Sequence, residues 1–243
     1  IRFLTSAKYM IQLAASIQED FQERPPLGRD VIAFSASTNL AMTFLAPWVT
    51  GLQQQIGEFD ITVQTDISGV HDHFERLRGR LSDFLLHYGH GVELLAMDAS
   101  KFESVTVGSD VLVPVCHRSF AQAGERILSE ENDAPVPYYS PWHTSSIANT
   151  IAKTIAESYP YVRLDTRVES STVGCTRAFV AQGAGVAWLP QSVIEQELAA
   201  GEFVRAGDRG FDIPLSIQIY RYLGNTKPAV LRLWEHISGR QPA

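Results

Sequence analysis

Short hydrophobic runs alternate with amphipathic helical segments along most of the chain. The runs Val31–Phe34, Phe59–Gln64 and Asp83–Tyr88 are predicted as buried strands, and apolar residues at helical spacing cover 41–56 and 70–78 between them. Pro47 lies inside the first helical segment and is expected to kink it or break off its first turn. Strands separated by helices of this length typically form parallel sheets with helices on both faces.

The second half of the chain repeats this pattern. Strands are predicted at Val136–Tyr139, Val162–Val168, Val186–Leu189 and Ile213–Tyr222, and helices at 145–158, 190–200 and 227–237. Between the two halves, Val105–Val115 is predicted as one or two strands, with Gly108-Ser109-Asp110 as a turn. Two such units in 243 residues indicate an α/β protein of two Rossmann-like subdomains with a cleft between them.

The first 24 residues have a different pattern, a heptad seam with spacings of 4, 3, 4, 3 and 4. The seam consists of Phe3, Ala7, Met10, Ala14, Ile17 and Phe21. Pro25-Pro26-Leu27-Gly28 then ends the helix and separates it from the rest. We interpret 1–24 as a linker and dimerisation helix; the alternative is a helix that packs on its own domain. Because the chain begins at Ile1 within this pattern, we expect it to be a piece of a longer protein.

Composition and charge restrict the class of protein. Hydrophobic residues make up 45% of the chain and charged residues 19%, which is typical of a globular protein and excludes general disorder. The net charge of −7 gives no electrostatic footprint for nucleic acid, so any DNA contact is expected from residues outside this sequence. Two cysteines suit a reducing cytoplasm, and the sequence has no apolar run long enough for a membrane helix.

The most informative stretch is residues 178–190, Ala-Phe-Val-Ala-Gln-Gly-Ala-Gly-Val-Ala-Trp-Leu-Pro. It predicts a helix ended by Gly183, a tight turn through Gly185, a buried strand and a helix opened by Pro190. This stretch resembles the signature of the effector domain of LysR-type transcription regulators. Further segments match the same family: Ser35–Leu40 with Leu45–Trp48, Leu77–Leu86, Leu112–Cys116 and Gly201–Val204.

The resemblance implies a fold like that of type II periplasmic binding proteins, preceded by the linker helix. It places regulatory subdomain I at 28–115 plus 217–243 and subdomain II at 116–216. It also implies a ligand- or oxidant-sensing domain that forms homodimers, can assemble into tetramers, reaches DNA only through an N-terminal domain outside this chain, and needs no cofactor. Val113–Cys116, 185–190 and 213–222 are similar to the hypochlorite-responsive subgroup, which implies an oxidant or stress cue.

In a two-subdomain fold, ligands bind at helix N-termini beyond the carboxyl ends of the strands. The first unit contributes loops with Ser35, Ser37, Thr38 and Asn39, then His87 and Tyr88. The second contributes Ser140, Trp142 and His143, then Ser170, Ser171 and Thr172. Hydroxyls and free backbone N–H groups suit a small anion or polar ligand. The same residue types also cap helices where no ligand exists.

Several histidines, one cysteine and the methionines are candidates for metal or redox chemistry, and each also has an ordinary structural interpretation. His87, His90 and His143 can converge across the cleft, but no carboxylate or cysteine stands at zinc-site spacing, so no metal is predicted. Cys116 precedes His117 and is a candidate thiolate; the alternative is a buried structural thiol. Oxidation of Met10, Met42 or Met97 would make an apolar contact polar, although methionines in such positions are commonly core residues.

Enzyme motifs are not found in the sequence. It has no G-x-S-x-G elbow, P-loop or H-E-x-x-H, and Gly183-Ala184-Gly185 precedes a strand, which is the wrong order for a dinucleotide site. We therefore expect a binding module rather than an enzyme. Two alternatives remain: a free-standing solute-binding protein, which would carry an export leader and no heptad seam, and an unrecognised α/β enzyme.

Overall fold

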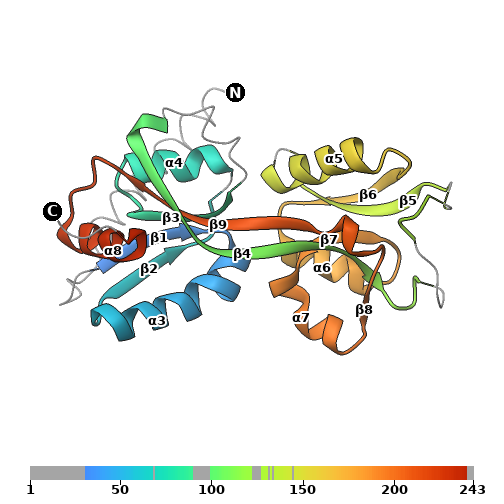
Figure 1. Ribbon diagram of the computed structural model, residues 1–243, viewed down its shortest axis with the longest axis horizontal. Coiled ribbons are helices and arrows are strands. Elements are labelled where there is room, and N and C mark those ends of the chain that lie inside the picture. Colours follow the sequence, from blue (N-terminus) through green and yellow to red (C-terminus); the bar gives the residue numbers. More distant parts are fainter. Residues whose placement is uncertain are drawn as a thin grey trace, which may run out of the picture.

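The computed structural model describes residues 31–67, 69–89, 99–121, 127–130, 132, 134–143 and 145–239. Two α/β lobes are joined by two long strands that run from one to the other (Figure 1). The predicted heptad helix 1–24 lies outside the described residues, as do His90 and Met97.

The strands of lobe I are β1 (Val31–Ala36), β2 (Asp60–Gln64) and β3 (Phe84–Gly89); those of lobe II are β5 (Val136–Pro141), β6 (Leu164–Ser170), β7 (Val186–Pro190) and β8 (Phe203–Arg205). The joining strands are β4 (Phe102–His117) and β9 (Ile213–Tyr222). Within the described residues the strand order is β2-β1-β3-β9-β4-β7-β5-β6, with β8 on β4. Pairing is parallel between β1 and its neighbours β2 and β3, and between β5 and its neighbours β6 and β7.

The helices of lobe I are α2 (Thr38–Leu40), the π-helical turn η1 (Ala41–Leu45), α3 (Ala46–Ile56), α4 (Val70–Arg78) and α8 (Pro228–Ser238); those of lobe II are α5 (Ser146–Ser158), α6 (Val173–Ala181) and α7 (Gln191–Ala199). Short 3₁₀ turns cover Ala99–Lys101 and Arg209–Phe211. The expected break at Pro47 does not occur, because helical structure runs on from α2 into α3. The wider π turn just before Pro47 accommodates a residue that cannot donate to the preceding turn.

Both faces of the lobe I sheet are buried. Along β3, Phe84 and Leu86 face one cluster and Leu85 the other, as the two-residue period of a strand requires. Phe84 stacks on Trp234 of α8 on the first face. On the second face Leu85 shares a cluster with Phe74 of α4. The helices therefore cover the sheet on both sides, which explains why these strands read as continuous hydrophobic runs.

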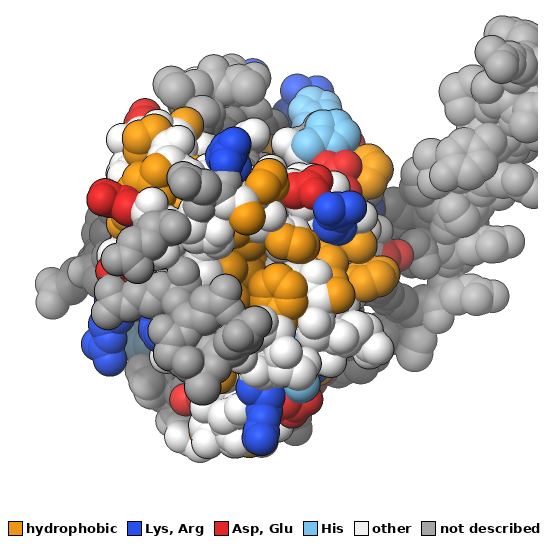
Figure 2. Space-filling model, turned by 90° about the vertical axis from the view of Figure 1, so that its right-hand side faces the viewer, with side chains coloured by type: hydrophobic (Ala, Val, Ile, Leu, Met, Phe, Trp, Pro, Cys, Tyr) orange, Lys and Arg blue, Asp and Glu red, His pale blue; other side chains and the backbone are white. Residues whose placement is uncertain are grey.

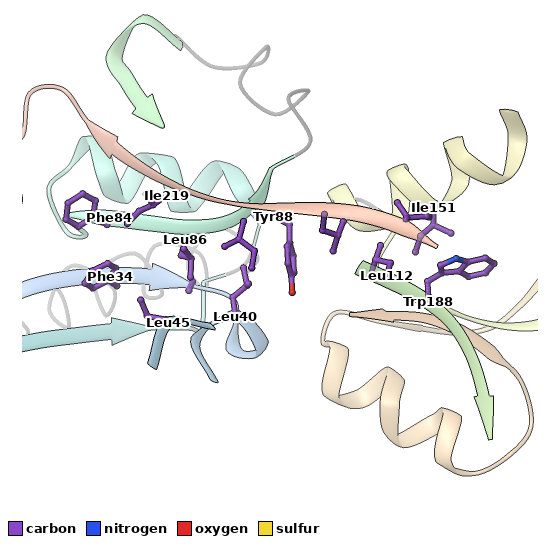
Figure 3. Close-up of a cluster of buried hydrophobic side chains, with 14 of the residues drawn as sticks. Phe34, Leu40, Leu45, Phe84, Leu86, Tyr88, Leu112, Ile151, Trp188 and Ile219 are labelled. Carbon is purple, nitrogen blue, oxygen red and sulfur yellow. The ribbon is translucent and has the colours of Figure 1, made fainter. Parts of the chain in front are cut away.

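The same alternation organises lobe II. On one face of β4 and β7, Val113 and Leu189 pack with Ile194 of α7. On the other face, Leu112 and Trp188 belong to the large cluster that continues into lobe I (Figure 3). The predicted two-subdomain α/β fold is confirmed, and a single hydrophobic cluster extends across its junction.

The segment Val105–Val115 differs from the prediction, since it is the middle of one sixteen-residue strand, β4, with no turn at Gly108–Asp110. Antiparallel pairing with β9 continues from Phe102 to Leu112, with one register shift between Thr106 and Gly108. The backbone N–H and C=O groups of residues 108–110 therefore find hydrogen-bond partners in the ladder with β9 rather than within a turn. Gly108 serves close packing instead: a Cβ there would lie 2.5 Å from the Phe44 ring.

Candidate ligand-binding site at the lobe junction

The register of the sheets brings the carboxyl ends of strands from both lobes to the same place. The carboxyl end of β3, at Gly89, pairs with Ser216, and Ser216 pairs with Ser109 of β4. From the other lobe, Pro190 at the carboxyl end of β7 pairs with Leu112. Strands β5 and β6 run parallel to β7 and end on the same side. Ligands of open α/β sheets bind outside such ends, so this junction is the candidate site.

A chain of polar groups crosses the junction. The side-chain amide of Asn39 donates to the Tyr88 hydroxyl (3.3 Å), which donates to Asp110 Oδ2 (3.0 Å). From lobe II, the Ser192 hydroxyl donates to the same Oδ2 (2.7 Å), and its backbone N–H donates to Oδ1 (3.3 Å). Ser192 Oγ also lies 3.3 Å from Thr43 Oγ1 of lobe I. The chain therefore joins the first turn of α2 to the first turn of α7.

Tyr88 is the buried centre of this chain, with only 3% of the residue exposed. Its hydroxyl oxygen points out of the row of hydrophobic side chains that the ring joins (Figure 3). Burial, reinforced by the nearby Asp110 carboxylate, raises the pKa of the Tyr88 phenol far above its ordinary value. The phenol therefore stays protonated and acts as a donor toward Asp110.

The loop after β1 is partly as predicted. Ser37 is the N-cap of α2, and Thr38 is exposed beside it. The Ser37 hydroxyl oxygen is buried and has no hydrogen-bond partner among the described residues. Ser35 was expected in this loop but belongs to strand β1, where it is fully buried with its hydroxyl 3.4 Å from the Phe84 carbonyl. It pairs with Gln64 and Leu85 in the sheet and does not face the junction loop.

His87 and Tyr88 also belong to a strand, β3, rather than to the loop after it. The ladder with β9 continues through both, since His87 pairs with Gln218 and Tyr88 with Ile217. His87 Nδ1 donates to the Tyr88 carbonyl (2.8 Å). Only the Tyr88 side chain of this pair joins the polar chain at the junction.

In lobe II, Ser140 lies in strand β5, where its hydroxyl donates to the Pro141 carbonyl (2.8 Å). Trp142 and His143 follow the strand as predicted; Trp142 is 46% exposed and its ring lies 5.2 Å from the His143 ring. Glu169 holds His143 in place by accepting from its backbone N–H (2.5 Å) and from its Nδ1 (2.7 Å). The exposed indole next to this hydrogen-bonded pair is an apolar surface that a ligand can contact.

The segment 170–172 is a capping loop. Ser170 ends strand β6 rather than lying beyond it, and its Oγ accepts from the Thr172 N–H (3.2 Å). Thr172 is the N-cap of α6, with its Oγ1 accepting from the Cys175 N–H (3.3 Å). Ser171 is exposed. The hydroxyls of Ser170 and Thr172 thus have partners within their own loop, whereas the Ser37 hydroxyl has none in the part of the chain that the structure describes.

The residues considered for metal binding and redox chemistry lie at separate places in the structure. Among the described residues no group of three or more His, Cys, Asp or Glu side chains is arranged to hold a metal ion. Cys116 is fully buried in β4, and Cys175 is exposed at the start of α6. Met42 is 72% exposed on the π turn, one residue before Thr43.

Asp110, Ser192 and Thr43 were not among the predicted site residues. Asp110 was assigned to a turn, and Ser192 and Thr43 were placed inside helices without a role. Ser192, two residues after the strand-ending Pro190, was a usable signal, because such a position lies in the first turn of a helix at the carboxyl edge of a sheet. The long-range pairing that brings Asp110 to the junction has no local signal.

Other surfaces point away from this site. The outer end of lobe II shows hydrophobic side chains gathered among charged ones (Figure 2), on the side away from lobe I (Figure 1). In the described part of the chain, no helix combines the length and hydrophobicity needed to cross a membrane.

Comparison with known proteins places the chain in a family. The family model described as "LysR substrate binding domain" matches residues 27–241. Two curated relatives are each 25% identical over 164 residues, or 67% of this chain: the HTH-type transcriptional regulator YjiE of Escherichia coli K12 and the HTH domain-truncated transcriptional regulator QseD of E. coli O157:H7. The chain spans 51% of the length of YjiE and 64% of that of QseD.

Solved structures share the fold. The ligand-free regulatory domain of HypT from Salmonella typhimurium is 20% identical, with a TM-score of 0.70 over 89% of this chain and 97% of that domain. Vibrio fischeri DarR, solved with DNA, is 22% identical, with a TM-score of 0.70 over 98% of this chain and 77% of DarR. The fold is therefore the two-lobed one of type II periplasmic binding proteins. With the family model spanning nearly its whole length, the chain belongs to the LysR substrate-binding domain family, the effector-binding domain of LysR-type transcription regulators.

Proposed function

We propose that this domain senses a small polar or anionic molecule bound at the lobe junction. The observation that carries the proposal is the convergence of strand carboxyl ends from both lobes, with the unpartnered Ser37 hydroxyl at the first turn of α2. A buried hydroxyl without a partner is costly, and a ligand oxygen or halide would supply the missing partner. Exposed Thr38 and Trp142 would extend the contact surface. HypT, a structural relative, has been solved with bromide bound, which makes halides a useful first probe.

A thermal-shift screen tests this proposal. The probes are sodium bromide, small carboxylic acids, phosphates and amino acids, applied to the wild-type chain, to Thr38→Val with Trp142→Ala, and to the exposed control Gln54→Ala. We expect at least one probe class to stabilise the wild type and the control but not the junction variant. Equal stabilisation of all three proteins contradicts the site, and no stabilisation by any class contradicts a small polar effector.

Oxidant sensing is a second candidate, favoured by the exposure of Met42. Its thioether is open to solvent on the π turn that also holds Thr43, so oxidation there would place a polar group beside the polar chain of the junction. HypT is described as hypochlorite-specific. The buried thiol of Cys116 is a poorer target. Mass spectrometry after mild hypochlorite treatment should find Met42 oxidised at least as fast as in the urea-unfolded chain; slower oxidation than in the unfolded chain contradicts this candidate.

We further propose that the domain acts in a cytoplasmic regulator as a homodimer able to form tetramers, and that it binds its effector without transforming it. LysR-type regulators work as oligomers that bind small effectors and DNA. The heptad seam of 1–24 supports pairing, and the effector state would reach a DNA-binding domain of the same regulator through that segment. The division into 28–115 plus 217–243 and 116–216 remains a proposal. Light scattering with and without residues 1–24 tests pairing; a monomer in both cases contradicts it.

A further inference from the structure

Asp110 lies on β4 at the point where the carboxyl ends of strands from the two lobes meet. Among the described residues its carboxylate accepts four hydrogen bonds, all from neutral groups. Oδ1 accepts from the backbone N–H of Val111 (2.7 Å) and of Ser192 (3.3 Å), and Oδ2 from the hydroxyls of Tyr88 (3.0 Å) and Ser192 (2.7 Å). An ionised carboxylate offers about four acceptor positions. The four donors therefore fill about as many acceptor positions as the carboxylate of Asp110 offers.

The donors come from different lobes. Tyr88 is anchored in lobe I, where its ring is buried in the central cluster. Ser192 lies in the first turn of α7 in lobe II and is exposed to solvent. The bond between Asp110 and Ser192 can therefore open and close without disturbing the core, while the bond to Tyr88 keeps the carboxylate in place.

Two carboxylates that do form ion pairs, Asp83 and Glu197, each act within one lobe. Asp83 accepts from Asn225 (2.8 Å) and Lys227 (2.9 Å), all in lobe I. In lobe II, Glu197 of α7 pairs with Arg177 of α6. Asp110 differs because its partners belong to both lobes, so breaking its contacts changes how the lobes are held rather than how either lobe is folded.

We propose that Asp110 is an interlobe latch that holds α7 against the carboxyl end of the lobe I sheet. Tyr88 connects the latch to the proposed ligand site, because its hydroxyl also accepts a hydrogen bond from Asn39 of α2. A molecule that takes the Asn39 amide or the first turn of α7 competes for groups that this chain of hydrogen bonds uses. Its binding is thereby coupled to the position of α7. The coupling to an effector rests on the proposed function; the latch itself does not.

Distance measurement by pulsed electron paramagnetic resonance tests the latch in the ligand-free chain. Spin labels are attached at Gln54→Cys on α3 and Glu195→Cys on α7, both exposed, in a Cys175→Ser background that removes the exposed native thiol. We expect one narrow distance distribution for this parent protein. Tyr88→Phe, Asp110→Ala and Ser192→Ala should each broaden or shift it, because each removes at least one hydrogen bond of the network that connects the lobes.

Asp208→Ala is the matched control. Asp208 also accepts a backbone N–H, from Gly210 (2.8 Å), but both residues lie in lobe II. The Asp208→Ala substitution should leave the distance distribution unchanged. The double variant Asp110→Ala with Ser192→Ala should change the distribution no more than the stronger of the two single variants does. Parent-like distributions in Asp110→Ala and Ser192→Ala overturn the proposal, as does an equal change in Asp208→Ala. If Asp110→Ala does not fold, Ser192→Ala alone decides, since it changes one exposed hydroxyl.

The interlobe latch and the effector site can be refuted independently of each other. Parent-like distances in the latch variants refute the latch and leave effector binding at the junction intact. Broadened distances, together with a thermal-shift screen in which no probe acts at the junction, refute the effector site and leave the latch.

Discussion

Acidification from about pH 7.5 to 4 should destabilise the folded chain through His73, a residue of α4. The His73 side chain is buried, and its Nδ1 has no hydrogen-bond partner among the described residues. Burial, followed by electrostatic interactions with His87 and Arg76, lowers the pKa of His73 from 6.5 to about 4. Each unit of pKa difference corresponds to about 1.4 kcal/mol, so protonation costs the folded state about 3 kcal/mol.

The direction follows from which state binds the proton. Above pH 6.5, His73 is neutral in both the folded and the unfolded chain and contributes no pH dependence. Between 6.5 and 4 the unfolded chain takes up a proton that the folded chain does not, so the free energy of unfolding falls with falling pH. Below about 4 both states are protonated, and this contribution levels off.

Urea unfolding followed by circular dichroism across this pH range measures the effect, with His73→Leu as the test variant. Other groups titrate as well, so the informative quantity is the difference between wild type and variant. That difference should change by about 3 kcal/mol between pH 7 and pH 4. His71→Leu is the matched control, an exposed histidine two residues earlier on the same helix, and it should keep the wild-type dependence. Parallel curves for wild type and His73→Leu would refute the reasoning.

Three further substitutions test the local geometry by thermal melts. Gly108→Ala places a Cβ 2.5 Å from the Phe44 ring, which is stacked on Trp48, and should cost about 1–3 kcal/mol, part of it recovered with Phe44→Leu. Gly183→Ala forces a side chain at φ +74° and should cost about 1 kcal/mol or more. Thr172→Ala removes the cap of α6 and should cost about 1 kcal/mol, whereas Thr172→Ser should not. A wild-type melting temperature in any of the three contradicts the geometry assigned to that residue.

Most of the fold could be predicted because its signals are local. The apolar runs of β1, β3 and β7 reflect strands covered on both faces. Gly183 follows the end of α6 at positive φ, as predicted. A Cβ on Gly185 would lie 2.9 Å from the Pro137 carbonyl, so a glycine is needed there for the close approach of the two backbone segments. Each of these features depends on a few neighbouring residues or on one face of an element.

The candidate site was only partly predictable, because its chemistry depends on long-range pairing. Hydroxyl-rich loops at the carboxyl ends of strands could be recognised. The sequence does not distinguish Thr172, whose hydroxyl caps its own helix, from Ser37, whose hydroxyl has no partner among the described residues. Gly108-Ser109-Asp110 looks like a turn when read alone. Its pairing with β9 continues strand β4 through these residues and brings Asp110 to the junction. Ser192 gains its role only from that placement.

The central claim is that an effector binds between the lobes, at the carboxyl ends of their strands. Hydrogen–deuterium exchange with mass spectrometry, on the wild-type chain with and without a compound that stabilises it, tests this most directly. We predict added protection in peptides that cover 37–39, 142–146 and 171–173, where the loops leave the two sheets. Added protection confined to the outer helices α3, α5 or α8, with none at these segments, would contradict it.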